Sequence, residues 1–407
     1  MRLNHNIMAI PQEYKQTELG IIPEDWEVKL FSQIFDMYPN NTYPRDCMND
    51  SRGVVRNIHY GDVLIKYPTI VDVEKCAIPY LNEDVKIKLQ KLVQSGDIII
   101  ADTAEDETVG KCVEIKNVGN NKIVAGLHTF FCRPTTPFAA GWLGYYINST
   151  KYHNQLIPYI TGIKVSSISR TSIQETKLLV PPIAEQRAIA AALSDVDGLI
   201  AALDKKIAKK RLLKQGAMQQ LLTGKKRLPG FTDEWVEKKL ESIADIYQPQ
   251  TISQEDFSID GYDVYGANGV IGKYHLYNHK TEQVMVTCRG SSCGTVNMSA
   301  GKCWITGNAM ILNMDKYDVS KTFIYYYLRK QDLSELITGS GQPQIVRTPL
   351  SEYVVKIPFD RIEQQAIATI LSDMDKEIAD LEAQRDKYRL LKSGMMQKLL
   401  TGQIRLK

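Results

Sequence analysis

A duplicated segment constrains the fold more than any other feature of this chain. Residues 185–228 align without a gap with residues 363–406, and 26 of the 44 positions are identical. Both copies close with Met-Gln-x-Leu-Leu-Thr-Gly, at 218–224 and 396–402. The offset of 178 residues is the size of a whole domain with its connector, so the chain is a duplicated two-part unit rather than a solenoid of short repeats.

Each copy predicts one long helix. Apolar residues recur at alternating spacings of three and four, which is the pattern of a heptad seam. Gly216 and Gly394 fall inside the pattern and are expected to interrupt or bend the helices. Because such a helix cannot bury its apolar stripe alone, we expect the copies to pair as an antiparallel coiled coil with approximate two-fold symmetry. The expected pairing residues are Ile189, Leu193, Val196, Ile200, Leu203 and Ile207 in the first copy and Ile367, Leu371, Met374, Ile378 and Leu381 in the second.

Weaker repeats mark two further domains. The lead-in Ile22–Trp26 resembles Phe231–Trp235. Short β-prone runs bounded by Gly, Asn, Asp and Ser predict strand-rich α+β domains between the lead-ins and the helices. The expected order is a strand-rich domain at 1–183, a spacer helix at 184–228, a second strand-rich domain at 229–357 and a second spacer helix at 358–407.

Composition narrows the class of protein. The chain has 407 residues, of which 43% are hydrophobic and 24% are charged, as in an ordinary globular protein. No run approaches the ~18 apolar residues of a membrane span, and the N-terminus lacks a signal-peptide core. We therefore expect a cytoplasmic protein with no membrane partner, and its seven cysteines are expected to be free thiols.

The net charge of +3 is small, but its distribution is uneven. Residues 184–228 carry ten basic and four acidic side chains, and Lys205–Arg227 holds nine basic residues and no acidic one. Such a run is typical of a solvated helix face, and it is also typical of a surface that binds nucleic acid or a partner protein.

The sequence contains no recognisable active-site motif. Phosphate-binding, dinucleotide-binding, zinc-protease and nucleophile-elbow patterns are missing, as is the Asp/Asn-Pro-Pro-aromatic motif of methyltransferases. Glu27-Val28-Lys29 imitates the E-x-K of metal-dependent nucleases, but it lies in the repeated lead-in, where the second copy reads Glu237-Lys238-Lys239 without the same upstream acid pattern. These absences favour a noncatalytic chain with no cofactor of its own.

Two clusters of potential ligands have alternative interpretations. The first could bind zinc but fits no C-x₂-C pairing, so buried free thiols are the simpler interpretation; it comprises His275, His279, Cys288, Cys293 and Cys303. The second is a solvated loop, a cation site, or an acceptor for the amino group of cytosine; it comprises Asp102, Glu105, Asp106 and Glu107.

Polar stretches just before each long helix suggest DNA binding. Thr161-Gly162 and Arg170-Thr171 recur as Thr338-Gly339 and Arg347-Thr348 at an offset of 177. Arg and Gln can make bidentate contacts to guanine and adenine, while Ser, Thr and Lys hold phosphates. The alternative is a surface loop without function, and recurrence in both halves favours DNA. The candidates are Lys164, Ser166, Ser167, Ser169, Arg170 and Thr171, then Ser340, Gln342, Gln344, Arg347 and Thr348.

The duplicated helix motif carries a family resemblance. Glu-Gln-x-Ala-Ile-Ala-x-x-Leu-Ser-Asp-x-Asp and Leu-Leu-Lys-x-Gly-x-Met-Gln-x-Leu-Leu-Thr-Gly both occur twice. With the Trp lead-ins, they make the chain resemble the DNA-specificity subunit of a Type I restriction-modification system. The resemblance implies two different target recognition domains, an asymmetric bipartite DNA target, and further DNA-binding candidates in the second domain at Tyr265, Asn268, Arg289 and Ser291.

The resemblance also implies partners. The chain would bind double-stranded DNA and two modification subunits, which use S-adenosylmethionine to methylate adenine N6. Restriction subunits that hydrolyse ATP with Mg would join the endonuclease. Two other classes stay open: a coiled-coil scaffold that does not read DNA, and an orphan methyltransferase or nuclease, which would need a cofactor motif that the sequence lacks.

Overall fold

The computed structural model describes residues 12–85, 91–162, 164–339 and 341–407. Ser340, one of the expected DNA-binding residues, lies outside these ranges. The chain divides into two compact units, Met1–Ala202 with Arg385–Lys407, and Leu203–Gln384. Each unit therefore contains one strand-rich domain, part of the long helix that follows it, and part of the other long helix. The sequence placed the domain boundaries at the ends of the helices, whereas the compact units divide within both helices.

The first unit holds most of the described strands. Its elements are β1 (Tyr14–Thr17), β2 (Gly20–Pro23), β3 (Glu27–Leu30), α1 (Phe31–Ile34), β4 (Phe35–Tyr38), η1 (Arg45–Cys47), β5 (Met48–Asn49), β6 (Val55–Ile58), η2 (Asp62–Lys66), β7 (Ile70–Asp72), β8 (Tyr80–Leu81), β9 (Ile98–Ala101), β10 (Thr103–Ala104), β11 (Cys112–Lys116), β12 (Lys122–Ala125), β13 (Thr129–Pro134), α2 (Trp142–Ile147), α3 (Thr150–Leu156), η3 (Ile157–Tyr159), β14 (Ser166–Ser167), α4 (Arg170–Gln174), β15 (Lys177–Val180) and the start of α5 (Ile183–Leu221).

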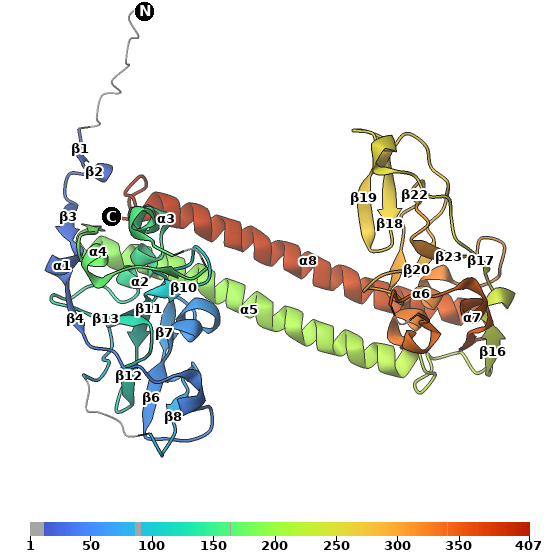
Figure 1. Cartoon of the computed structure of the whole chain (residues 1–407), viewed down its shortest axis with the longest axis horizontal. Coiled ribbons are helices and arrows are strands. Elements are labelled where there is room, and N and C mark those ends of the chain that lie inside the picture. Colours follow the sequence, from blue (N-terminus) through green and yellow to red (C-terminus); the bar gives the residue numbers. More distant parts are fainter. Residues whose placement is uncertain (1–11, 86–90, 163, 340) are drawn as a thin grey trace, which may run out of the picture. The chain divides into compact units, whose positions relative to one another are not determined.

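Two larger sheets organise the first domain (Figure 1). One has the strand order β4-β13-β9-β11-β7 and the other β12-β6-β8-β5. Strand β9 lies in the middle of the first sheet, and all four of its residues are buried. A continuous apolar run of this kind is typical of a strand covered on both faces. The aromatic side chains of Trp26, Trp142 and Tyr146 fill the core beside this sheet.

The second unit repeats this plan with fewer strands. Its elements are the end of α5, then β16 (Trp235–Lys239), η4 (Leu240–Ser242), β17 (Asp245–Tyr247), η5 (Gln254–Asp256), β18 (Tyr262–Gly266), β19 (Gly269–Tyr274), β20 (Val284–Thr287), β21 (Val296–Met298), β22 (Trp304–Ile305), β23 (Ala309–Asn313), α6 (Lys321–Lys330), η6 (Ser334–Leu336), α7 (Arg347–Glu352), β24 (Val354–Pro358) and the start of α8 (Arg361–Leu399).

The main sheets of the two domains share their strand order. The order β17-β23-β20-β21 in the second unit corresponds to β4-β13-β9-β11 in the first, and each central strand is fully buried. The second sheets differ, since β19-β18-β22 stands where the first domain has four strands. The predicted combination of strand-rich α+β domains and long helices is confirmed, and the divergence lies in the second sheet and the loops.

Helices α5 and α8 are each 39 residues long and run without a break (Figure 1). The prediction that Gly216 and Gly394 interrupt the helices is wrong. Both residues and their neighbours on either side are α-helical. A Cβ added at either glycine would meet no atom within 4 Å. No local packing within either unit therefore requires glycine at these two positions.

The apolar seam of each helix has more than one partner. In the first unit Ile189 and Leu193 join the core of the strand-rich domain together with Leu399 and Leu400. In the second unit Ile367 and Leu371 do the same with Leu221 and Leu222. A separate cluster in the second unit contains Leu203, Ile207, Ile378 and Leu381. The start of each helix thus packs on its own domain and on the end of the other helix.

Each unit contains an arginine paired with a buried glutamate at equivalent repeat positions. In the first unit Arg405 donates two hydrogen bonds of 2.7 Å to Glu185, whose side chain is only 3% exposed. In the second unit Arg227 donates to Glu363 at 2.7 and 2.8 Å. The indole N–H of Trp26 also donates to Glu185, at 2.9 Å. The end of one helix is thereby tied to the start of the other.

Acidic residues of α8 neutralise part of the basic run Lys205–Arg227, which begins in α5 and continues past its end. Within the second unit, four of the nine basic side chains of Lys205–Arg227 pair with carboxylates of α8. These pairs are Lys210–Glu377, Arg211–Glu382, Lys214–Asp375 and Arg227–Glu363. Helix pairing therefore accounts for a large part of the basic run.

We predict that Arg405→Ala destabilises the protein strongly. The substitution leaves the Glu185 carboxylate buried without its cation, and breaking a buried pair in this way costs about 3–5 kcal/mol of unfolding free energy. Urea denaturation measures the change. Lys387→Ala, which removes an exposed cation of α8 within the same unit, is the control. Equal unfolding midpoints for the two variants would contradict a stabilising role for the pair.

Candidate nucleic-acid interface

In the first unit, the loop after the central strand β9 lies against the polar stretch before α5. The backbone N–H of Asp102 donates to the carbonyl of His128 at 3.2 Å, and the Asp102 carbonyl accepts from Ile168 N–H at 2.9 Å. The next residue, Thr103, pairs with Ser167 where β10 meets β14. The two loops therefore form one surface at the end of the main sheet.

The second unit repeats this arrangement with other residues. The N–H of Cys288 donates to the carbonyl of Asn308 at 3.1 Å, and the Cys288 carbonyl accepts from Ile345 N–H at 3.1 Å. Arg289 then pairs with Gln344 in an antiparallel bridge. Backbone hydrogen bonds thus make Asp102 equivalent to Cys288, and the Thr103–Ser167 pair equivalent to the Arg289–Gln344 pair.

The recurring Thr-Gly dipeptides are explained by backbone geometry. Thr161 and Ser167 exchange two backbone hydrogen bonds of 3.0 and 2.8 Å, and Thr338 and Gln344 exchange two of 2.8 and 2.9 Å. Gly162 and Gly339 have φ values of 113° and 90°, a region that favours glycine. A Cβ there would lie 2.0 Å from the carbonyl oxygen of Val165 in the first unit and 2.7 Å from that of Gln342 in the second.

The DNA-binding candidates in the described ranges lie on or beside these loops. Most are exposed, namely Lys164, Ser169, Arg170, Thr171, Asn268, Arg289, Ser291, Gln342, Gln344, Arg347 and Thr348. Ser166 and Ser167 are half-buried in β14, and Tyr265 is half-buried in β18. Asn268, at the turn between β18 and β19, donates to the hydroxyl of Ser292 at 2.7 Å. This contact brings the β18–β19 turn to the loop that carries Arg289.

The two arginines of the second loop surface have side chains that are available to bind a ligand. Arg289 and Arg347 are exposed, and neither side chain has an ion pair or hydrogen bond with any residue in the described ranges. With Gln344 and Tyr247 they line a pocket of about 370 Å³. Burial raises the pKa of the Cys288 thiol, which lines the same pocket, so the thiol is protonated at neutral pH and is a poor nucleophile.

Arg170, the counterpart of Arg347, is partly engaged. Both arginines are the first residue of a short helix, α4 or α7. One Nη of Arg170 donates to the carbonyl of Met37 at 2.8 Å. A guanidinium has five donors, so Arg170 holds strand β4 and still has donors available.

Sequence reasoning missed part of the first-unit surface. The hydroxyl of Thr103 donates to the Asp102 carboxylate at 2.8 Å, and the His128 ring lies 3.3 Å from the same carboxylate. The ring of Tyr60 meets the His128 ring edge to face, with centroids 5.4 Å apart. The sequence feature that could have indicated Thr103 is its position two residues after the apolar strand β9, just as Arg289 lies two residues after the apolar strand β20. Tyr60 lies 68 residues from His128 in the chain and gave no signal.

In the described ranges, the side chains that the sequence suggested for a metal site or a nuclease site do not form one. There, no group of three or more His, Cys, Asp or Glu side chains could hold a metal ion. His279 shares a hydrogen bond of 2.8 Å with the Tyr247 hydroxyl, and burial lowers its pKa. Asp106 is exposed, and hydrogen bonds from Thr108 lower its pKa. Glu27 forms an exposed ion pair with Lys29 at 2.7 Å. All seven cysteines are free, as expected.

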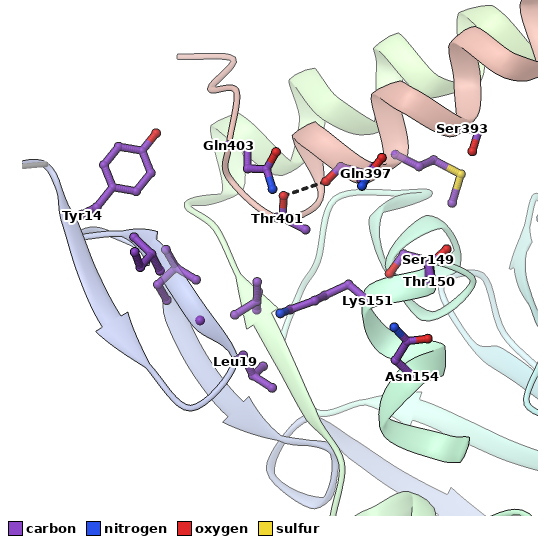
Figure 2. A pocket seen from close by; sticks show the side chains of 15 residues that line it. Tyr14, Leu19, Ser149, Thr150, Lys151, Asn154, Ser393, Gln397, Thr401 and Gln403 are labelled. Atoms are coloured by element: carbon purple, nitrogen blue, oxygen red, sulfur yellow. Dashed lines mark hydrogen bonds between the residues drawn. The ribbon is translucent and has the colours of Figure 1, made fainter. Parts of the chain in front are cut away.

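A second hollow of the first unit, shown in Figure 2, has a volume of about 850 Å³. The β1–β2 hairpin, α3 and the end of α8 line it. Lys151 and Asn154 extend from α3, and Gln397 accepts a hydrogen bond of 2.7 Å from Thr401 through its backbone. Among the residues that line this hollow there is no carboxylate, imidazole or thiol. It therefore holds no carboxylate–imidazole pair of the kind that activates a hydroxyl nucleophile.

Comparison with known proteins shows which proteins this chain is similar to. Residues 232–388 match the family model described as the Type I restriction modification DNA specificity domain. The fold is that of the S subunit of a Type I restriction-modification system from M. genitalium, with a TM-score of 0.62, 14% identity and coverage of 98% of both chains. A chain from a study of complex assembly and conformational transition in the type I R-M system has a TM-score of 0.54 and 17% identity, over 94% of this chain and 99% of that one.

Two relatives from Methanocaldococcus jannaschii extend the likeness along the chain. The putative type I restriction enzyme MjaX specificity subunit is 28% identical over 97% of both chains. The MjaVIII specificity subunit is 26% identical over 98% of this chain and 99% of its own. The resemblance predicted from the duplicated motifs is thus confirmed: the chain is similar along nearly its whole length to type I restriction enzyme specificity subunits. None of the helices in the described ranges has the length and apolar composition needed to cross a membrane.

We predict that Arg347→Ala weakens DNA binding more than Arg170→Ala does. Arg347 forms no side-chain hydrogen bond or ion pair in the described part of the chain and only contributes to lowering the pKa of Asp245, whereas Arg170 donates a hydrogen bond to the Met37 carbonyl. Loss of a base contact costs about 1–3 kcal/mol and relaxes specificity, while loss of a phosphate contact weakens binding uniformly. Titrations with target and nontarget DNA distinguish these outcomes. Unchanged affinity in both variants would exclude the two arginines from the interface.

Proposed function

We propose that this chain is the noncatalytic DNA-reading subunit of a type I restriction-modification complex. Each strand-rich domain would read one half of an asymmetric bipartite target. The observation that carries this proposal is the recurrence of one loop arrangement, fixed by the same backbone hydrogen bonds, with different side chains in each unit. Two different half-sites require different side chains on loops of the same backbone structure, which is what the two units have.

The chemistry of the loops supports a role in reading DNA. The exposed side chains of the second unit are Arg, Gln, Ser and Asn, which can bond to base edges. Lys164 and the serines of the first unit are of the kinds that hold phosphates and fix register on the duplex. Neither loop surface needs a cofactor for this role.

We further propose that α5 and α8 pair along their lengths as an antiparallel, pseudo-two-fold coiled coil that spaces the domains. In support, the N-terminal half of one helix contacts the C-terminal half of the other within each unit. Lys392 binds Asp197 at 2.7 Å in the first unit, and Lys214 binds Asp375 in the second. The two pairs occupy equivalent positions in the repeat, at the offset of 178.

The partners we propose are two modification subunits, which would supply S-adenosylmethionine and methylate adenine N6. Restriction subunits with ATP and Mg would join them in the cytoplasm, where the DNA lies. Two copies of one partner need two equivalent surfaces, and the duplicated helix segment offers a pair. Leu212 and Leu213 are 68% and 50% exposed, and their counterparts Leu390 and Leu391 are 76% and 52% exposed.

The glycines one turn further along support the same surfaces. Gly216 and Gly394 lie in open space in mid-helix, where glycine costs about 1 kcal/mol relative to alanine. A partner whose backbone approaches closely at this point would account for a glycine in both copies. We name the groups Leu212, Leu213 and Gly216, and Leu390, Leu391 and Gly394, the two docking patches.

The test of the function is an exchange of domains. Replacing residues 31–180 by the equivalent region of a relative with another target should change one half-site and leave the other unchanged, because each domain carries its own loops. Methylome sequencing of a host that carries the system reads out both half-sites. A change in both halves would overturn independent reading, and no change in either would favour a scaffold that does not read DNA.

The docking patches have a separate test. Changing both Leu390 and Leu391 to Ser should remove one of two modification subunits from the complex, and changing all four leucines should remove both. The mass of the reconstituted complex gives the stoichiometry. Leu199→Ser is the matched control, since Leu199 is 48% exposed and its counterpart is Glu377. A complex that keeps two modification subunits after all four changes would rule out these patches.

A further inference from the structure

The equivalence of the two loop surfaces allows a residue-level assignment, which rests on the proposed function. Backbone bonding places Arg289 and Gln344 of the second unit where the first unit has Thr103 and Ser167. Directly paired residues of antiparallel strands have Cβ atoms about 4.5–5.5 Å apart and project on the same side. Arg289 and Gln344 therefore form one adjacent pair of side chains on the loop surface.

This pair has unsatisfied bonding capacity. Both side chains are exposed, and in the described part of the chain neither forms a side-chain hydrogen bond or ion pair. Both line the pocket of about 370 Å³, together with Arg347. A guanidinium carries donors only, so the ligand group that faces Arg289 must present acceptors.

We propose that Arg289 reads a guanine in the half-site of the second domain, through N7 and O6 in the major groove, and that Gln344 contacts the neighbouring base pair. The guanine edge is the base edge that presents two acceptors matching the guanidinium fork. The backbone of Arg289 is held by its bridge to Gln344, so only the side chain has to be ordered on binding.

The first unit cannot make the same contact at this position. Thr103 and Ser167 carry short hydroxyls, and the Thr103 hydroxyl already donates to Asp102 at 2.8 Å. A hydroxyl cannot span N7 and O6 of guanine with two donors. The guanine requirement set by this position therefore belongs to the second half-site alone, which is how one frame yields two different sequences.

The experiment measures binding of the reconstituted complex to DNA in which each guanine of the second half-site is replaced singly by 7-deazaguanine. At one position, loss of N7 should weaken binding by the unmodified protein roughly tenfold, because one of two bonds to the guanidinium is removed. With Arg289→Ala the same replacement should have no further effect. Arg329→Ala, an arginine on α6 that bonds Tyr325, should behave as the unmodified protein does.

Lysine at the same position separates base reading from phosphate binding. Arg289→Lys keeps the positive charge but lacks the planar fork, so it should lose sensitivity to 7-deazaguanine as the alanine variant does. Restored affinity and unchanged sensitivity in the lysine variant would make Arg289 a phosphate contact and overturn the assignment. The assignment also fails if every 7-deazaguanine effect persists in Arg289→Ala while specific binding remains. Absence of specific binding by the unmodified complex would instead overturn the proposed function.

Discussion

In each compact unit, a buried glutamate near the start of one long helix accepts two hydrogen bonds from an arginine that follows the other helix. A buried carboxylate is costly unless it is paired and hydrogen-bonded, so this contact specifies which helix ends meet. In the first unit, Glu185 also binds the indole of Trp26, which ties the lead-in strand to the same point. The strand-rich domain, the helix that follows it and the end of the other helix are thus held together by one polar site within an apolar core.

The duplicated segment explains why the helices could be predicted and their partners could not. Periodicity identifies an apolar stripe, and Ile189, Leu193, Ile367 and Leu371 are indeed buried. Periodicity does not say what covers the stripe, and in both units a strand-rich domain shares that role with the other helix. The basic run of α5 was ambiguous for a related reason, because its carboxylate partners lie on α8, more than 130 residues away in the chain.

The loop surfaces could be predicted in part. Thr-Gly and Arg-Thr recur at a fixed offset, since the hairpin needs glycine at positive φ and the short helix after it begins with arginine. Tyr60 could not be predicted, because the residue that its ring contacts, His128, lies 68 residues away in the chain. Equivalence between Thr103 and Arg289 became visible only from hydrogen bonds of the backbone, which are indifferent to side-chain identity.

That indifference would allow one fold to serve the two half-sites that we propose. Backbone atoms and buried strands hold the loops, so the exposed side chains of Arg289 and Gln344 contribute little to stability. Surface substitutions of this kind usually change the free energy of unfolding by less than about 0.5 kcal/mol. The side chains proposed to recognise DNA could then change without destabilising the hydrophobic core. The opposite holds for Glu185 and Arg405, whose removal would disturb both core and helix pairing. A chain built in this way keeps the order of its main sheet and the backbone bonding of its loops in both copies, and it varies the side chains at the ends of its central strands.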